Sequence, residues 1–206
     1  MIKDINELMK ELESTHLNKI DYDKSIFDNR ENAVKIVELR RGEMGVRFLP
    51  LDVKRDKDFI IPALKKNAGI YIYLENEDKA NEEYALTALQ SDEEIFPFFF
   101  EHIEFTKEFL KKASEVNVEW SANLPQQYYQ DGNLMAELFK TVEEFMPYDN
   151  FLMNMWVSCF EDLDYMIPLV KYNWGIISEA DESIQEDLLK YVPKGHKKEA
   201  REMCGL

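Results

Sequence analysis

Three histidines are the first residues to consider for metal binding or acid–base chemistry. His16, His102 and His196 are far apart in the sequence, without the close spacing that metal ligands usually show. His102 lies between Glu101 and Glu104, and these side chains could form a weak site for a divalent cation. An ordinary surface histidine explains the segment more simply. We therefore predict no metal site in this chain.

The two cysteines offer a second possible chemistry. Cys159 and Cys204 are too few to form a disulfide framework, and no neighbouring residues give them zinc-site spacing. A reactive thiolate needs partial exposure and positive neighbours, whereas Glu161 and Asp162 would raise the pKa of Cys159. Because Cys159 also lies in an apolar stretch, the sequence predicts a buried structural thiol.

Acidic pairs could in principle act as a general acid and a general base. Glu93 with Glu94 and Glu143 with Glu144 are two such pairs. Most acidic pairs lie where helices are predicted to begin, and carboxylates stabilise the helix dipole there. The sequence has no glycine-rich phosphate loop, no G-x-S-x-G and no H-E-x-x-H. We expect no catalytic residue and no cofactor, and an enzyme of unrecognised type remains an alternative.

The aromatic residues are the more informative set, because they exceed what a core of this predicted type requires. Aromatic side chains left on a surface and ringed by acids would form a protein interface. The predicted interaction surface comprises Tyr71, Tyr73, Phe98, Phe100, Trp120, Tyr128 and Tyr129, together with Glu101 and Glu104. The alternative for each aromatic residue is packing inside the core.

One short sequence pattern occurs four times in the chain, and the helices that it predicts would position these side chains. Its first residues are helix-capping types that stand 25 residues apart: Asp56, Asn81, Thr106 and Asp131. Apolar residues follow three, seven and fourteen positions after each cap: Phe59, Tyr84, Phe109 and Leu134; Ala63, Ala88, Ala113 and Leu138; Ile70, Ile95, Trp120 and Phe145. Self-similarity at a fixed period predicts stacked repeats, in which no unit can bury its apolar face alone.

Each repeat is predicted to hold two short helices, because a second set of capping residues recurs within it. These residues are Asn67, Ser91, Asn117 and Thr141. Ser91 and Thr141 are each followed three positions later by a glutamate, which is a capping box. The segment Ile70–Leu74 has the composition of a strand. We predict a helix there, because the corresponding segment of the next copy contains Pro97.

The ends of the chain depart from the exact period. Residues 1–29 are predicted to form an N-terminal capping helix, over 2–14, and a linker. Residues 30–155 hold the repeats, which are clearest over 56–155. Residues 156–206 hold a divergent last repeat, a closing helix and a basic tail. The last repeat is inferred because Phe160–Pro168 resembles Phe139–Pro147 at an offset of 21 residues, and the tail from Lys194 to Arg201 is expected to be solvated and frayed.

The fold prediction that follows is one all-α domain over residues 1–206. Short tandem helical hairpins would stack as a small solenoid, covered at each end by a capping helix.

The segment Asp56-Lys-Asp-Phe-Ile-Ile-Pro-Ala-Leu-Lys-Lys-Asn-Ala-Gly-Ile70 resembles the opening of a bacterial and viral tandem-repeat family catalogued as a domain of unknown function. The family's units have a similar length. The likeness is close for Asp56–Asn81, fair for Asn81–Asp131 and poor elsewhere, and the later copies lose the glycine. The resemblance implies a helical repeat fold and carries over no catalytic residue.

The charge balance limits the classes of partner. The chain has 41 acidic and 25 basic side chains and a formal net charge of −16. Such a surface repels nucleic-acid phosphates and anionic lipid, so we expect no direct nucleic-acid or membrane binding. The start of the sequence lacks the apolar core of a secretory signal, and we expect a cytoplasmic location.

The function predicted from these features is non-enzymatic binding of a protein partner that has a basic surface. The partner would meet the acidic, aromatic-bearing face of the helical repeats. An alternative is an acidic inhibitor or immunity-type protein that imitates the charge of nucleic acid. It would require acids spaced along one continuous stripe.

Overall fold

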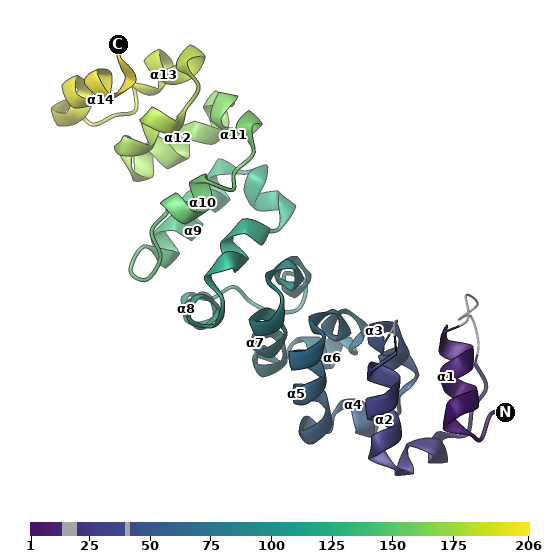
Figure 1. The fold of residues 1–206 in the computed structure, drawn as a ribbon. Helices are drawn as coiled ribbons and strands as arrows, with labels where there is room; N and C mark the ends of the chain where they lie inside the picture. Colours follow the sequence, from purple (N-terminus) through teal and green to yellow (C-terminus); the bar gives the residue numbers. More distant parts are fainter. Residues whose placement is uncertain (14–19, 40–41) are drawn as a thin grey trace. The chain divides into compact units, whose positions relative to one another are not determined.

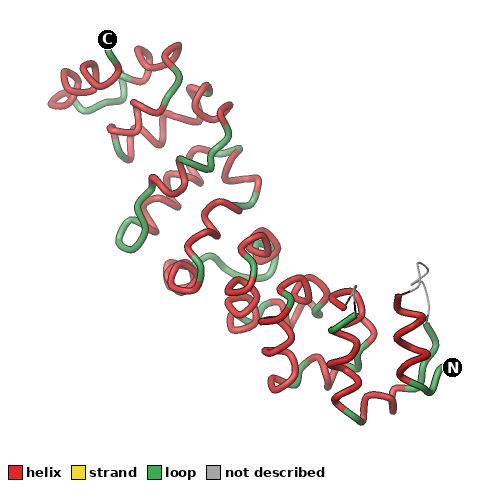
Figure 2. The backbone as a smooth tube through the Cα atoms, viewed as in Figure 1, coloured by secondary structure: helices red, strands yellow, loops and turns green. Residues whose placement is uncertain are grey.

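The computed structural model describes residues 1–13, 20–39 and 42–206. Short α-helices and 3₁₀-helices follow one another along these ranges (Figures 1 and 2). Strand-type pairing within them is limited to one isolated bridge between Ile2 and Tyr22. The all-α prediction is therefore confirmed. None of the described helices combines the length and the apolar character that crossing a membrane requires.

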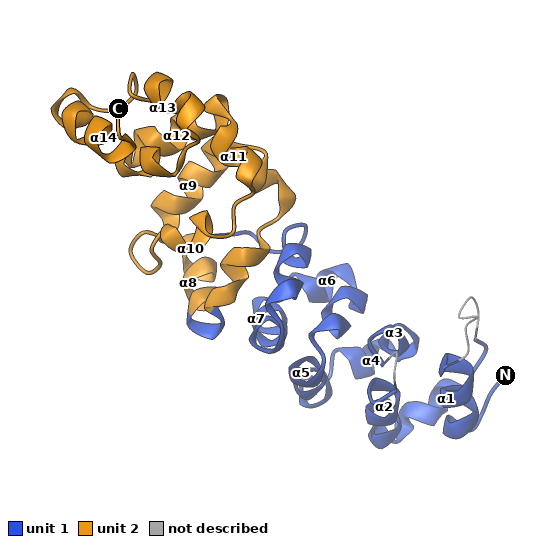
Figure 3. Ribbon diagram, turned by 45° about the horizontal axis from the view of Figure 1, so that its top comes forward, with its two compact units in different colours: residues 1–105, 115–117 blue, residues 106–114, 118–206 orange. Residues whose placement is uncertain are grey.

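Backbone packing divides the chain into two compact units (Figure 3). Unit 1 comprises residues 1–105 and 115–117, and unit 2 comprises residues 106–114 and 118–206. The single domain expected over residues 1–206 stays a prediction.

Unit 1 alternates short α-helices with 3₁₀-helices. Its elements are α1 (Ile5–Glu13), η1 (Lys24–Asp28), α2 (Arg30–Val37), α3 (Gly42–Gly45), η2 (Val46–Phe48), α4 (Leu51–Lys54), α5 (Lys57–Lys66), η3 (Ala68–Tyr73), α6 (Asn76–Lys79), α7 (Glu82–Ser91) and η4 (Glu93–Phe99). Helix α5 packs against α2 on one side and against α7 on the other. Fully buried Ile36, Ile60 and Leu89 mark the core between these three helices.

Unit 2 is built in the same way. Its elements are most of α8 (Lys107–Val116), η5 (Val118–Asn123), η6 (Gln126–Tyr129), α9 (Gly132–Val142), α10 (Asp149–Leu152), α11 (Val157–Glu161), α12 (Leu163–Tyr172), η7 (Trp174–Glu179), α13 (Glu182–Leu188), η8 (Lys194–His196) and α14 (Lys197–Cys204). Helix α12 packs against α9, η7 and α13.

The four predicted caps are confirmed. The side chains of Asp56, Asn81 and Asp131 accept hydrogen bonds from the backbone N–H two residues later, at 3.1, 3.0 and 2.8 Å. The hydroxyl of Thr106 accepts from the N–H of Phe109 at 3.1 Å. Each cap satisfies one of the backbone donors that a helix start leaves without an intrahelical partner.

The predicted core positions are buried in most copies. Phe59, Tyr84 and Phe109 are buried, whereas Leu134 of the fourth copy is exposed. All four residues seven positions after the caps are buried, and so are Ile70, Ile95 and Trp120, whereas Phe145 is half-buried.

The second helix of the first three copies is a 3₁₀-helix, and the predicted second caps of the second and fourth copies were wrong. Asn67 caps η3, but Asp92 rather than Ser91 caps η4, because α7 runs through Ser91. Thr141 lies inside α9. The segment Ile70–Leu74 belongs largely to η3, so the helical prediction for it was right and the strand alternative was wrong.

Helix α12 begins after Asp162, a cap that sequence analysis missed. Asp162 caps α12, accepting from the N–H of Asp164 at 2.9 Å. Pro168 and Asn173 follow this cap by six and eleven residues, as Pro62 and Asn67 follow Asp56. The offset of 21 residues was therefore wrong, because it aligned Pro168, inside α12, with Pro147, which lies after α9.

The two ends of the chain are helical. In α1 the apolar side chains of Leu8 and Leu12 are buried. Helix α13 is capped by Asp181, and the basic tail forms η8 and α14 instead of a frayed end. Helix α14 packs against η7, and Ala200 is buried.

Candidate interaction surface

The 3₁₀-helix η4 sorts its phenylalanines into two groups. With three residues per turn, Phe96 and Phe99 lie on the same side of η4. Both side chains are buried, and their rings meet edge to face with centroids 5.6 Å apart. Phe98 is 48% exposed, and Phe100, directly after η4, is 40% exposed. The local geometry therefore fills the core of unit 1 and also leaves two rings at its surface.

Two carboxylates accompany these exposed rings. A turn follows η4, closed by a hydrogen bond from the N–H of Ile103 to the carbonyl oxygen of Phe99 at 2.8 Å. Glu101 and Glu104 lie in or beside this turn, and both side chains are exposed. Negative charge thus flanks Phe100 along the chain.

Tyr73 occupies the position in η3 that Phe98 occupies in η4, 25 residues later. Its side chain is half-buried, and η3 packs against η4. We call Tyr73, Phe98, Phe100, Glu101 and Glu104 the aromatic–acidic surface of unit 1. These are five of the nine residues in the predicted interaction surface.

Three other residues of that prediction lie in the core. Tyr71 is fully buried, its hydroxyl donates to the carbonyl oxygen of Lys79 at 2.6 Å, and burial raises its pKa. Trp120 is fully buried, and its Nε1 donates to Oγ of Ser114 at 3.1 Å. Tyr129 is buried as well. As corrections, these three residues do not belong to an exposed surface.

The repeat pattern itself contained the signal for burying Trp120. Trp120 stands at the repeat position of Ile70 and Ile95, and all three side chains are buried. Its ring packs against Phe151 with centroids 5.6 Å apart. A residue at a repeated core position should have been assigned to the core.

The remaining residue of the prediction, Tyr128, lies in unit 2. It is half-buried, and burial raises its pKa. Unit 2 also exposes apolar side chains that the prediction omitted, among them Met153, Trp156 and Val157. The ring of Trp156 stacks on Tyr129 with centroids 5.5 Å apart. The available signal was an apolar segment that lies outside the repeated core positions.

Of the residues considered first for chemistry, His102 lies beside this surface in the sequence, between Glu101 and Glu104. His102 is half-buried, the ring of His196 stacks on Trp174, and His16 lies outside the described residues. In the described ranges, no group of three or more His, Cys, Asp or Glu side chains could hold a metal ion. Cys159 is buried, and burial raises the pKa of its thiol, so the prediction of a buried thiol is confirmed.

No family model, curated protein or solved structure matches this chain. The resemblance to the tandem-repeat family therefore stays a prediction.

Proposed function

We propose that this chain is a protein-interaction module, and that its aromatic–acidic surface binds a protein partner with a basic surface. In this proposal, short helical hairpins stack as a solenoid, with α1 covering the N-terminal end and the C-terminal helices closing the other. The encounter takes place in the cytoplasm.

A contact that recurs inside unit 1 supports the repeat. Nδ2 of Asn67 donates to a carboxylate oxygen of Glu43 at 3.3 Å. Nδ2 of Asn117 donates to a carboxylate oxygen of Glu93 at 3.4 Å. The second pair lies 50 residues after the first, which is two repeat steps of 25 residues. Equal steps along the sequence thus give the same side-chain contact twice.

The exposure of Phe98 and Phe100 beside Glu101 and Glu104 carries the functional proposal. Aromatic side chains are enriched among the residues that dominate binding energy at protein interfaces. The acids add charge complementarity, which mainly raises the association rate. With a net charge of −16, the whole chain favours encounter with a basic surface.

The test compares the proteins that the wild-type chain and matched variants retain from a lysate of the source organism. Phe98→Ser with Phe100→Ser removes the two exposed rings. Met153→Ser with Val157→Ser is the matched control, since it removes two exposed apolar side chains from unit 2. A partner of this surface is retained by the wild type and the control and lost from the Phe98/Phe100 variant. After its purification, the partner's affinity falls at least about tenfold in that variant.

Salt dependence tests the electrostatic part of the proposal, and variants separate the proposal from charge mimicry. Raising the salt concentration should lower the association rate of the purified partner more than it changes the dissociation rate. Equal binding by the Phe98/Phe100 variant would contradict the proposal. If the Phe98/Phe100 variant bound equally and Glu101→Gln with Glu104→Gln abolished binding, an inhibitor that imitates nucleic-acid charge would be the better account.

A further inference from the structure

A groove with an apolar floor runs between α2 and α5 in unit 1. Its volume is about 350 Å³. The floor is formed by Val34 and Val37 of α2 and by Phe59, Pro62 and Ala63 of α5. Helix α5 has ten residues, so the groove can be no longer than roughly 15 Å.

Helix α2 departs from the residue pattern of α5 and α7. Three positions after its cap Asn29, α2 has Asn32, where α5 and α7 have Phe59 and Tyr84. The side chain of Asn32 donates to the carbonyl oxygen of Ile26 at 2.7 Å. On the groove side of α2, Val34 is 47% exposed. The corresponding residue of α5 is the larger Ile61, which is half-buried.

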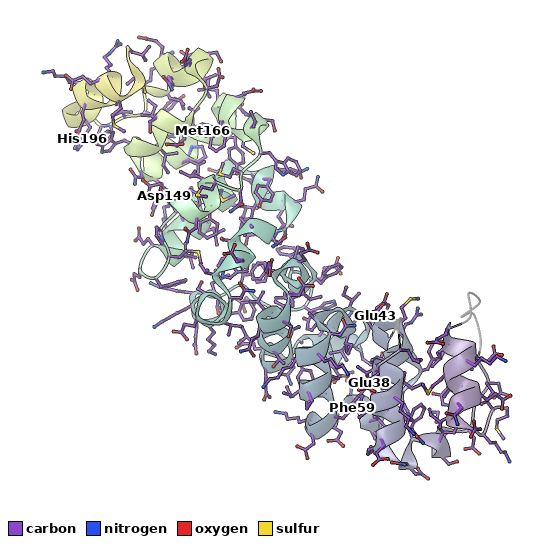
Figure 4. The ribbon with its side chains drawn as sticks, in the orientation of Figure 1. Glu38, Glu43, Phe59, Asp149, Met166 and His196 are labelled. Carbon is purple, nitrogen blue, oxygen red and sulfur yellow. The ribbon has the colours of Figure 1, made fainter. Side chains whose placement is uncertain are left out.

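Ion pairs join the two helices at both ends of the groove. At the N-terminal end, Nε of Arg30 lies 3.7 Å from a carboxylate oxygen of Asp56. At the C-terminal end, Nζ of Lys66 lies 2.7 Å from a carboxylate oxygen of Glu38. Glu38 and Phe59 are labelled in Figure 4. These pairs align the helix ends and leave the apolar floor open between them.

Two acids on the rim are left over for a ligand. Glu31 on α2 and Asp58 on α5 line the N-terminal part of the groove, and their side chains are exposed. Neither side chain is in an ion pair within the described ranges. The N-terminus of each helix contributes about half a positive charge. Two carboxylates exceed that charge, so this part of the groove favours a cation.

We propose that the α2–α5 groove binds a peptide segment of a protein partner that carries one large apolar side chain next to a lysine or arginine. The apolar side chain lies on Val34, Phe59 and Pro62, and the cation lies between Glu31 and Asp58. A volume of about 350 Å³ is at the lower end of the roughly 300–1,000 Å³ typical of small-molecule sites. It therefore accommodates one or two side chains rather than the face of a long helix.

This groove is a second site, separate in its residues from the aromatic–acidic surface. It contains none of Tyr73, Phe98, Phe100, Glu101 or Glu104. Loss of binding at one site therefore leaves the other testable. The variants Phe98→Ser and Phe100→Ser leave binding in the groove unchanged.

The test titrates the full-length, ¹⁵N-labelled chain with two short peptides at low ionic strength. The first has the sequence Gly-Ser-Leu-Lys-Arg-Ser-Gly with blocked ends, and the second has serine in place of leucine. The leucine peptide should bind at least about tenfold more tightly, because only it buries an apolar side chain. Its amide shifts should concentrate in α2 and α5. Equal affinity of the two peptides, or no binding of either, would overturn the proposal.

Variants locate the site and its charge. Val34→Trp fills the groove and should remove the advantage of leucine over serine. Asp58→Lys should weaken the leucine peptide at least about fivefold, by placing a positive charge beside its cation. Asp164→Lys is the matched control, because Asp164 stands two residues after the cap of α12, as Asp58 does in α5.

Asp164→Lys should change the affinity less than about twofold, since it alters only the net charge. Equal weakening by the two lysine variants would overturn the proposal by showing that the attraction is nonspecific. Shifts of the same α2 and α5 amides on adding unlabelled chain, without peptide, would overturn it in favour of a second copy as the occupant. Circular dichroism checks that each variant keeps its helices.

Discussion

The helix pairs α5–α7 and α9–α12 use the same repeat positions but pack differently. The caps of α5 and α7 are 25 residues apart, whereas those of α9 and α12 are 31 residues apart. Directly after its cap, α5 has Lys57, whose Nζ lies 2.5 Å from a carboxylate oxygen of Glu83 on α7. At that position α9 has Gly132, and a Cβ there would lie 2.0 Å from the carbonyl oxygen of Tyr165 on α12.

The two pairs therefore share their caps and apolar positions although their connections differ in length. In α5–α7 long side chains bridge the helix starts, and in α9–α12 the backbones approach directly. The longer connection in unit 2 contains α10 and α11, and with them the exposed side chain of Trp156.

The largest expected effect comes from adding a methyl group where the backbones of α9 and α12 approach each other. Gly132→Ala places a methyl group against the Tyr165 backbone, which cannot move away as a flexible side chain could. We expect the free energy of unfolding to fall by about 2 kcal/mol. Lys57→Ala, at the matched position, should cost less than about 0.5 kcal/mol, because it removes only an exposed ion pair. Urea denaturation followed by circular dichroism measures both, and similar losses would refute the difference in packing.

A smaller loss of stability is expected from removing a tyrosine hydroxyl three positions after the cap of α12, whereas the matched change in α7 should have little effect. The hydroxyl of Tyr165 donates to the carbonyl oxygen of Tyr128 at 2.8 Å. Tyr165→Phe leaves that partly buried acceptor without its donor and should cost about 1.5 kcal/mol. The hydroxyl of Tyr84 makes no such bond within the described residues, so Tyr84→Phe should be nearly neutral. A comparable cost in the two variants would count against this contrast.

The caps of α5 and α12 should contribute equally to stability, although the two helix pairs pack differently. Asp56→Ala and Asp162→Ala each remove an acceptor from the first turn of a helix. We expect each to cost about 1 kcal/mol in the same urea assay. Asn is the control at both positions, since it keeps the accepting oxygen and should retain most of the stability. A negligible cost at Asp162 alone would show that α12 is not capped like α5.

The smallest expected effect near neutral pH is the pH dependence of stability that arises from buried tyrosines in both units. Burial raises the pKa of Tyr71 in unit 1 and of Tyr165 in unit 2, and burial together with Glu143 raises the pKa of Tyr172 to about 12. Because the fold favours the neutral phenol, this stabilisation is complete below the ordinary tyrosine pKa of about 10. It is lost as the pH rises through the folded-state values.

Absorbance of phenolate and helical circular dichroism, recorded together during an alkaline titration, check this prediction. The buried tyrosines should ionise only as the helices are lost. Ionisation of all ten tyrosines near their ordinary pKa, with the helices intact, would contradict it.

The parts of the fold that could be predicted are those determined by neighbouring residues in the sequence, such as helix starts. Asp56, Asn81 and Asp131 were found because a side-chain acceptor directly before an apolar periodic run marks a helix start. Asp162 was missed because a search at a fixed period of 25 residues passes over a cap 31 residues further on.

The exposure of the aromatic residues could be predicted only in part. Adjacent residues turn by about 120° in a 3₁₀-helix and by about 100° in an α-helix. Over the phenylalanine run of η4, this difference decides which rings face the core. The sequence pattern did not distinguish the two helix types, so it did not separate buried Phe99 from exposed Phe98. The α2–α5 groove was also missed, because it depends on how α2 and α5 pack, which the sequence pattern does not specify.

The placement of the tryptophans gives this protein a built-in reporter of cooperativity. All three, Trp120, Trp156 and Trp174, belong to unit 2. Selectively excited tryptophan emission therefore follows the melting of unit 2 alone, whereas far-ultraviolet circular dichroism sums the helices of both units. Coincident curves would mean that the two units melt as one thermodynamic body, and separated curves would mean that each has its own transition.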